Sequence, residues 1–375
     1  MRIGILTLPL HTNYGGILQA YALQTVLERM GHEIEVFNLK PKKQTQPLWR
    51  YPLCYAKRCY QRFIRKQSVI IFREYYVNKT QPIIAEKINT FINHNIHLKV
   101  LDKLDELNNK DYNALVVGSD QVWRPRYFHF PGGIKNAYLH FAKDWNTKRI
   151  AYAASFGTDE WEYSSTETTE CANLIKLFDD VSVREKTGVE LCREKFAISA
   201  FHVLDPTMLL DKEFYIDLLS KGNTHKPSGT LLCYILDPTD ANTKLINDIS
   251  LLYKLVPFKA NAKSNNISDC IEDRMLPSIE QWLRSFYDAE LVVTDSFHAC
   301  VFSIIFEKQF VVVGNKGRGL TRIISLLEMF DLQDRLVDCI DDLGKMSRID
   351  FVGVHKLLHT YQVKSQEFLK RSLYE

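Results

Sequence analysis

Apolar positions at the start of the chain predict a strand, a helix and a second strand. Residues 3–6 form a short apolar run, which is typical of a strand that is buried on both faces. Within residues 17–30, apolar side chains recur every three or four positions, as on the inner face of a helix, and Gly31 follows as a helix-ending residue. Residues 34–39 are predicted to form a second strand. This order predicts a parallel sheet with a right-handed crossover.

The alternation of strands and helices returns twice further along the chain. The strands predicted in the two later sets are residues 114–117, 149–155, 181–184 and 201–204, and then residues 230–236, 254–259, 291–294 and 310–313. Helices are predicted over residues 277–287 and 320–330. The sequence therefore predicts an α/β protein with two Rossmann-like domains, residues 1–207 and residues 229–350, followed by a C-terminal helix over residues 354–373.

Composition adds an uneven distribution of charge. Hydrophobic residues make up 46% of the 375 residues and charged residues 25%, which fits a folded protein and excludes a mostly disordered one. The net charge is only +3. Residues 40–79, however, contain eleven lysines and arginines against a single acid, Glu74, so this basic insertion carries +10 and the rest of the chain −7. Aromatic residues lie between these cations.

Two interpretations of the basic insertion stay open. Cations mixed with aromatic residues suit an anionic surface, such as lipid head groups or a lipid-linked diphosphate. The other interpretation, which we rank equally, is that residues 40–79 form a solvated helical insertion whose aromatic side chains pack on the N-terminal domain. Nucleic acid is a poorer third partner, because no recognition motif accompanies the charge, and we expect no nucleic-acid binding.

Hydropathy and cysteine spacing indicate where the protein works. The apolar run at residues 3–10 is too short for a secretory signal, and no stretch approaches the roughly 18 apolar residues of a membrane helix. We therefore expect a cytoplasmic protein, peripheral at the inner face of the membrane if residues 40–79 bind lipid. None of the eight cysteines forms a CxxC pair, so we expect no metal site and mostly buried thiols.

The loop after the first predicted strand is a candidate ligand site, because ligands of open α/β sheets bind at the carboxyl ends of strands. It contains Asn13, Tyr14, Gly15 and Gly16 just before a helix. The glycines let the backbone approach a ligand, and the helix N-terminus favours an anion. The loop is not a GxGxxG motif, which argues against NAD binding, and it is not a P-loop either. Asn13 is alternatively a helix cap.

A second candidate follows the strand at residues 114–117. Ser119, Asp120, Gln121 and Trp123 lie just beyond it, as expected of a pocket wall. Trp123 is either a stacking surface for a sugar or a core anchor. Asp120 is expected to bind a hydroxyl group or to cap a helix.

Arg184 is a third candidate, because an arginine at the end of a buried strand is unusual. Its guanidinium suits two-point contact with a carboxylate or phosphate. The alternative is an ion pair with a neighbour such as Glu185 or Asp180.

The fourth candidate follows the strand at residues 291–294. Asp295 and Ser296 are helix-capping residue types, and His298 falls in the first turn of the next helix. That position combines anion binding with acid–base chemistry. The alternative is a capping or core histidine.

A cationic loop comes soon after, with glycines between Lys316, Arg318 and Arg322. We expect this loop to fold over a phosphate group. The alternative is an exposed basic turn.

Taken in order, these motifs resemble those of the bacterial polysaccharide pyruvyl transferase family across nearly the whole chain. The resembling stretches are residues 13–16 with 19–20, 117–123, 182–185, 204–207 and 294–298. The resemblance implies a GT-B-like arrangement of two domains around a cleft. It also implies transfer of pyruvate from phosphoenolpyruvate onto two hydroxyls of a sugar, in a cell-surface glycan or lipid-linked saccharide, to form a cyclic ketal. Phosphoenolpyruvate is then the donor substrate, and no separate cofactor is expected.

The resemblance also assigns residues. It places a phosphoenolpyruvate-binding arginine at Arg184 and a catalytic or donor-binding histidine at His298. For the base that such a reaction needs, we consider Asp295 and Asp120 as weaker candidates beside His298. Ser296 stands where some members of the family have an arginine, and the loop of residues 316–322 is a candidate to supply that charge.

Two alternative functions remain. One is a GT-B-type glycosyltransferase in which the cationic loop binds the diphosphate of a nucleotide sugar. The other is a non-catalytic protein that docks onto a membrane assembly through residues 40–79.

Overall fold

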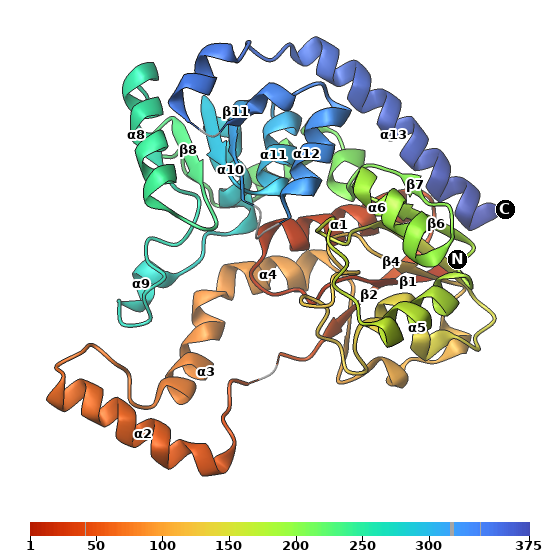
Figure 1. Ribbon diagram of the computed structural model, residues 1–375, viewed down its shortest axis with the longest axis horizontal. Coiled ribbons are helices and arrows are strands. Elements are labelled where there is room, and N and C mark those ends of the chain that lie inside the picture. Colours follow the sequence, from red (N-terminus) through yellow and green to blue (C-terminus); the bar gives the residue numbers. More distant parts are fainter. Residues whose placement is uncertain (42, 316–318, 338) are drawn as a thin grey trace.

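The computed structural model describes residues 1–41, 43–315, 319–337 and 339–375, and it contains two parallel β-sheets flanked by helices (Figure 1). The first sheet has the strand order β3-β2-β1-β4-β5-β6-β7, and the second has the order β12-β11-β10-β8-β9. The strands of the first sheet all fall within residues 1–207, and those of the second within residues 229–350. The predicted α/β class with two Rossmann-like domains is thereby confirmed.

The strands are short, and almost every central one is buried on both faces. The strands of the first sheet are β1 (Arg2–Leu6), β2 (Glu33–Leu39), β3 (Leu98–Leu101), β4 (Ala114–Val117), β5 (Lys148–Ala154), β6 (Asp180–Val183) and β7 (Phe201–His202). Those of the second sheet are β8 (Leu231–Tyr234), β9 (Pro257–Phe258), β10 (Leu291–Thr294), β11 (Gln309–Val313) and β12 (Leu336–Val337). Ile3 of β1 is aligned with Ile34 of β2 and with Ala114 of β4, so apolar side chains meet across the sheet.

Most differences between predicted and observed elements lie at element ends and at sheet edges. Lys254 takes a left-handed conformation that ends a helix, so the strand predicted at residues 254–259 is reduced to β9. The strand predicted at residues 230–236 ends early because the backbone N–H of Leu236 donates to a side chain instead of a neighbouring strand. The edge strands β3 and β12 are short, and the hydrophobic pattern does not predict them.

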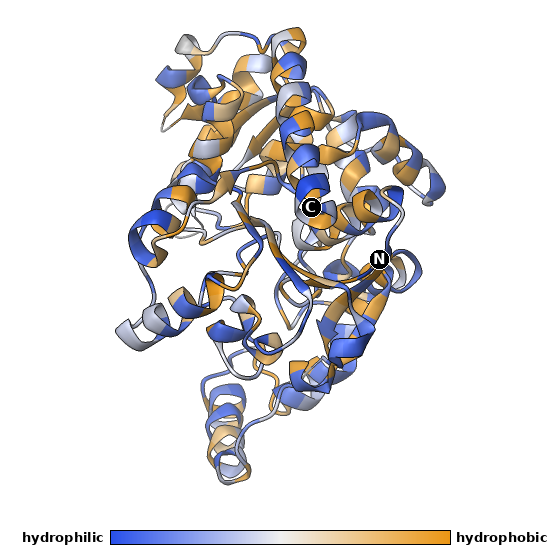
Figure 2. Cartoon of the chain, turned by 90° about the vertical axis from the view of Figure 1, so that its right-hand side faces the viewer, coloured by the Kyte–Doolittle hydropathy of each residue, from blue (hydrophilic) through white to orange (hydrophobic). Residues whose placement is uncertain are grey.

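Most of the helices cover the two sheets, whereas those within residues 51–84 lie away from both (Figure 1). They are α1 (Tyr14–Arg29), α2 (Tyr51–Cys59), α3 (Arg73–Ile84), α4 (Glu86–Asn95), α5 (Ser165–Ile175), α6 (Lys186–Leu191), α7 (Lys212–Lys221), α8 (Asp240–Tyr253), α9 (Ile271–Arg274), α10 (Ile279–Asp288), α11 (Phe297–Ile305), α12 (Leu320–Met329) and α13 (Phe351–Tyr374). Hydrophobic colour in Figure 2 is concentrated on the strands and the helices around them. Gly31, at φ +86°, follows α1 as predicted.

Apolar contacts and the C-terminal helix join the two domains. One continuous cluster of buried side chains includes residues of both sheets. Within it, Tyr14 of α1 stacks on Trp282 of α10 with ring centroids 5.3 Å apart. Helix α13 starts in the second domain and ends against the first (Figure 1), where Arg371 forms a 2.8 Å ion pair with Asp180. The two domains are therefore held in one defined arrangement.

The basic insertion forms an arm that extends away from both sheets (Figure 1). Helix α2 lies along the end of the arm, and α3 connects it to the body. Large aromatic side chains of the arm are exposed: Trp49 by 66%, Phe63 by 66% and Tyr75 by 71%. The interpretation in which these aromatic residues pack on the N-terminal domain is therefore wrong. In the described parts of the chain, no helix is long and apolar enough to cross a membrane.

Candidate active site

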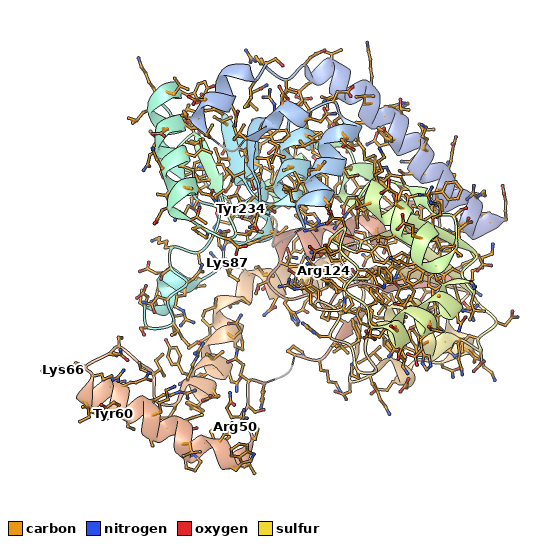
Figure 3. The ribbon with its side chains drawn as sticks, in the orientation of Figure 1. Arg50, Tyr60, Lys66, Lys87, Arg124 and Tyr234 are labelled. Atoms are coloured by element: carbon orange, nitrogen blue, oxygen red, sulfur yellow. The ribbon has the colours of Figure 1, made fainter. Side chains whose placement is uncertain are left out.

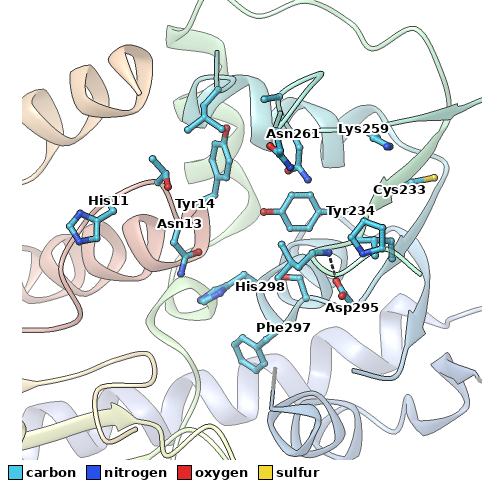
Figure 4. Close-up of a pocket in the computed structure, with 18 of the residues that line it drawn as sticks. His11, Asn13, Tyr14, Cys233, Tyr234, Lys259, Asn261, Asp295, Phe297 and His298 are labelled. Carbon is cyan, nitrogen blue, oxygen red and sulfur yellow. Dashed lines mark hydrogen bonds between the residues drawn. The ribbon is translucent and has the colours of Figure 1, made fainter. Parts of the chain in front are cut away.

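A cleft of about 1200 Å³ lies between the two domains, where the carboxyl ends of both sheets meet (Figure 4). The loop after β1 contributes Asn13 and Tyr14, and the loop after β4 contributes Asp120 and Gln121. The second domain contributes residues 234–236, at the end of β8, and residues 295–298, which follow β10. Three of the four strand ends selected from the sequence therefore line one cavity, which is where an open α/β fold binds its ligand.

His298 lies at the bottom of this cleft and is 6% exposed. It belongs to the first turn of α11, yet its ring packs against the start of α1 in the other domain. A methyl group added at Gly15 would lie 2.1 Å from Nδ1 of His298, so only glycine fits there. Nε2 lies 3.8 Å from Oδ2 of Asp205. Burial lowers the pKa of His298 to about 4, because the nearby carboxylates only partly offset the cost of burying a charge. The imidazole is therefore neutral at pH 7.

Arg184 lies beneath the cleft instead of lining it. Its guanidinium donates to Asp205 at 2.6 Å and to Asp120 at 3.1 Å, and it lies 4.3 Å from the ring centroid of Phe297. Burial alone would lower the pKa of Arg184, but the two carboxylates outweigh it and raise the pKa. The ion-pair alternative was thus nearer to the structure, although the partners are not the sequence neighbours Glu185 and Asp180.

The two carboxylates that hold Arg184 are fully buried and ionised. Burial would raise the pKa of Asp120 and of Asp205, but Arg184 lowers both, helped by Arg322 at Asp120 and by the hydrogen bond from Thr207 at Asp205. Asp205 also accepts hydrogen bonds from the backbone N–H and the hydroxyl of Thr207. Asp120 lines the cleft, so it offers a fixed negative oxygen next to His298.

Arg322, one of the three cations of the predicted loop, lines the cleft. It lies in the first turn of α12, not in a loop, and Nη1 is 3.8 Å from Oδ1 of Asp120. Its guanidinium lies 5.6 Å from the ring centroid of Phe297. Burial, together with repulsion from Arg184, lowers the pKa of Arg322 to about 10, so it stays charged at neutral pH. Lys316 and Arg318 lie outside the described residues.

Asp295 and Ser296 lie at the edge of the same cavity, where Asp295 has a positioning role. Its carboxylate accepts the backbone N–H groups of Leu236 at 2.7 Å and Asp237 at 3.2 Å, and the side-chain amide of Asn315 at 3.0 Å. It thereby ties together the loops after β8, β10 and β11. Ser296 is the N-cap of α11, but its side chain makes no capping hydrogen bond.

Two residues expected in a pocket are instead part of the interior. Trp123 is fully buried, stacks on Tyr138 with centroids 5.1 Å apart, and donates its indole N–H to the carbonyl of Ala137. It is a core anchor and does not line the cleft. Ser119 is also fully buried, and its hydroxyl donates to Gln19 at 2.8 Å.

Residues 13–16, at the start of α1, have two roles: some line the cleft, and the others pack against neighbouring side chains. Asn13 and Tyr14 line the cavity, and the Asn13 side chain makes no capping hydrogen bond. Gly15 lies against His298, and Gly16 lies against Asn13.

Comparison with known proteins identifies the family. The family model for polysaccharide pyruvyl transferase matches residues 13–317, which is well over half of the chain. The chain belongs to the polysaccharide pyruvyl transferase family. The resemblance found in the sequence motifs is thereby confirmed, and this family member is classed with transferases. A comparison with curated proteins gave no match.

Among the solved structures compared, one with a TM-score above 0.5 supports a GT-B fold for this family member. Arabidopsis thaliana UGT89C1 complexed with UDP-L-rhamnose is 7% identical with a TM-score of 0.51, over 99% of this chain and 98% of that chain. The same protein with quercetin is 10% identical with a TM-score of 0.49, over 99% of both chains. An alpha-glucosyltransferase complexed with UDP and a 13-mer DNA is 10% identical with a TM-score of 0.46, over 100% and 95% of the chains. At these identities the likeness shows the fold alone.

Sequence reasoning did not select several residues that build the site of this pyruvyl transferase family member. Asp205 carries the ion pair to Arg184, Phe297 has the guanidinium groups of both Arg184 and Arg322 near its ring, and Gln19 orients Ser119. Asp205 follows an apolar strand and precedes a proline, which was the available signal for it. Glu185 was considered only as a partner of Arg184. It instead accepts the backbone N–H groups of the loop after β5, and burial raises its pKa.

Gly15→Ala in this family member tests whether the contact between α1 and His298 matters. We expect kcat/KM to fall about 10- to 100-fold, because the new methyl group must displace the imidazole and misplacement of about 1 Å is costly. Steady-state kinetics measures the effect. Gly16→Ala is the matched control, since its methyl group would lie 3.1 Å from the movable Asn13 side chain. Equal losses in the two variants would contradict a specific role of Gly15.

Proposed function

We propose that this protein transfers pyruvate from phosphoenolpyruvate onto two hydroxyls of a sugar, in a glycan or lipid-linked saccharide, and closes a cyclic ketal. Family membership supports the reaction class. The observation that carries the proposal is the neutral imidazole of His298 at the bottom of the cleft, beside the cation Arg322 and the ionised Asp120. The reaction needs a binding site for a small anionic donor and a group that accepts a proton, and this arrangement offers both.

Binding of the donor is proposed at the helix starts around His298. Phosphoenolpyruvate carries a phosphate and a carboxylate. The N-cap residues of α1 and α11, Asn13 and Ser296, leave the first backbone N–H groups without a side-chain acceptor, which favours an anion. Arg322 adds a charged guanidinium from the start of α12. Arg184 is proposed to act as a positioning residue that fixes Asp120 and Phe297, instead of contacting the donor itself.

The proposed chemistry balances without an added oxidant or reductant. A proton is added to the methylene carbon of phosphoenolpyruvate, and the first sugar oxygen bonds to C2 as its own proton leaves. The bond between C2 and the phosphate oxygen then breaks, and the second sugar oxygen bonds to C2. The two hydroxyl protons end on the new methyl group and on the released phosphate. No redox cofactor is therefore proposed.

His298 is proposed as the base that accepts a hydroxyl proton. A base must be unprotonated before the reaction, and the pKa of about 4 keeps this imidazole neutral at physiological pH. Binding of the anionic donor raises that pKa, which favours proton transfer once both substrates are in place.

The rest of the cleft has the size and lining for a saccharide. The whole cleft has a volume of about 1200 Å³, which exceeds the range of about 300–1000 Å³ that is usual for the pocket of one small ligand. Tyr14, Tyr127 and Tyr234 present aromatic rings, and Asn242 and Asn261 present amides that suit sugar hydroxyls. In Figure 4 the side chains of Tyr234 and Asn261 lie across the open space from Asn13 and Tyr14.

Arg322→Met tests the donor site by calorimetric titration with phosphoenolpyruvate. We expect the Kd to rise about tenfold or more, because a hydrogen bond to a charged group is lost. Arg126→Met removes the same charge from an exposed residue outside the cleft lining, and we expect it to bind like the unmodified protein. Titration with UDP-glucose distinguishes the glycosyltransferase alternative. Binding of UDP-glucose without binding of phosphoenolpyruvate would contradict the proposal.

A further inference from the structure

The arm carries an exposed apolar stripe along one side of α2 and the turn that follows it. Trp49, Leu53, Tyr60, Phe63 and Ile64 are between 51% and 67% exposed. The first four are spaced four, seven and three residues apart, and Ile64 follows Tyr60 by four, which is the spacing of side chains that share one face of a helix. Side chains of this size are costly to leave in water, so a contiguous apolar surface of this kind marks an interaction site.

Cations flank the apolar stripe. Arg50, Lys57, Arg62, Arg65 and Lys66 are all exposed. Figure 3 shows Arg50, Tyr60 and Lys66 along the arm, away from Arg124 and Tyr234 on the body. An amphipathic helix with aromatic and aliphatic side chains on one face and cations beside them is suited to the boundary between water and an anionic bilayer.

The single acid of the insertion does not weaken this positive surface, because it is used inside the arm. Glu74 of α3 accepts two hydrogen bonds from Arg58 of α2, at 2.7 and 2.8 Å. Arg58 holds the pKa of Glu74 at about 2, so the pair stays ionised. Arg58 also donates to the carbonyl of Ile71, and Tyr55 packs edge-on against Phe72. These contacts hold α2 in place before any partner binds.

The base of the arm is connected to the mouth of the cleft. Arg274 of α9 donates to the hydroxyl of Tyr76 of α3, and the backbone N–H of Leu276 donates to the carbonyl of Ile84. Leu276 itself lines the cleft, as do Lys263 and neighbouring residues just before α9. The arm and the residues at this side of the cleft are therefore in direct contact.

We propose that the arm, residues 48–76, docks the protein on an anionic phospholipid bilayer, with the apolar stripe in the interface and the flanking cations at the head groups. A lipid-linked saccharide in that bilayer then reaches the cleft mouth beside α9. This second statement rests on the proposed function, whereas the docking itself does not. Charge complementarity selects a bilayer over a protein partner, because residues 48–76 contain seven lysines and arginines against one acid and also expose aromatic side chains.

Co-sedimentation of the full-length protein with vesicles tests the docking. We expect binding to phosphatidylcholine vesicles that contain phosphatidylglycerol, and at least roughly tenfold weaker binding to phosphatidylcholine alone. Neutralising Lys57, Arg62, Arg65 and Lys66 to glutamine is expected to weaken binding to anionic vesicles by at least roughly tenfold. A separate variant, Leu53→Ser with Phe63→Ser and Ile64→Ser, is expected to weaken it as strongly, because the apolar stripe is lost.

The matched control removes an equal charge elsewhere, with Lys176, Lys356, Lys364 and Lys370, all exposed, changed to glutamine. We expect it to bind anionic vesicles almost as well as the unmodified protein. Equal loss in the control, or equal binding to both kinds of vesicle, would overturn the docking proposal. Titration of every variant with phosphoenolpyruvate separates the two proposals. Donor binding without vesicle binding overturns only the docking, and vesicle binding without donor binding overturns only the proposed reaction.

Discussion

His298→Ala is expected to lower kcat/KM with phosphoenolpyruvate and an acceptor saccharide by about 10²–10⁴-fold, the usual contribution of a general acid–base group. The side chain is buried at the bottom of the cleft, so removing it deletes the proposed base and leaves an unfilled space next to Asp205. Release of inorganic phosphate measures the rate. His11→Ala and His129→Ala are matched controls, because both histidines line the cleft away from the ion-pair cluster, and we expect small effects from them.

The pH dependence of the same variant identifies the role of the imidazole. In the free protein His298 is neutral above about pH 4 and becomes protonated as the pH falls through that value. If it acts as a base, the ratio of wild-type to His298→Ala kcat/KM stays constant from pH 7 downward and then falls near pH 4. A ratio that instead rises as the pH falls would show that the protonated imidazole is the active form, and the assignment as base would be wrong.

Arg184→Met is expected to lower the free energy of unfolding by about 3–5 kcal/mol, because it leaves two buried carboxylates without their common partner. Both Asp120 and Asp205 are at most 2% exposed, so water cannot replace the guanidinium. Urea denaturation followed by circular dichroism measures the change.

The control for this stability effect is Arg371→Met. Arg371 pairs with Asp180 at 2.8 Å, but its side chain is 40% exposed, and surface pairs contribute only about 0–1 kcal/mol. Changing Asp120 and Asp205 to asparagine together with Arg184→Met is expected to recover part of the loss, since the unpaired charges are then removed. A loss of stability in Arg184→Met no larger than in Arg371→Met would contradict the structural role given to this ion pair.

The arrangement of the sheets was predictable because local patterns determine it. Short apolar runs separated by helices mark most of the strands, and polar residues just beyond them mark the ends that border the cleft. His298 could be selected because it follows such a run directly. The partners of Arg184 could not, since Asp205 and Asp120 lie 21 and 64 residues away in the sequence and meet it only through the sheet order.

Side-chain exposure was the least predictable property. Trp123 and Trp49 are the same residue type, each next to an arginine, yet one is fully buried and the other 66% exposed. Their surroundings differ because Trp123 follows a central strand, whereas Trp49 lies on an arm that the sheets do not cover. The sequence of residues 40–79 is compatible with both situations, which is why two interpretations stayed open until the position of the arm was known.

The contact between Gly15 and His298 also constrains how the protein can be divided or rebuilt. The imidazole belongs to α11 of the second domain, while Gly15 of α1, which packs against it, and Asp205, whose carboxylate lies 3.8 Å from it, belong to the first domain. Neither half of the chain, expressed separately, contains a complete set of reacting groups. Substitutions where Gly15 meets His298 must also be made in compatible pairs. A chimaera that exchanges one domain for that of a relative therefore needs both contact surfaces to match at this histidine.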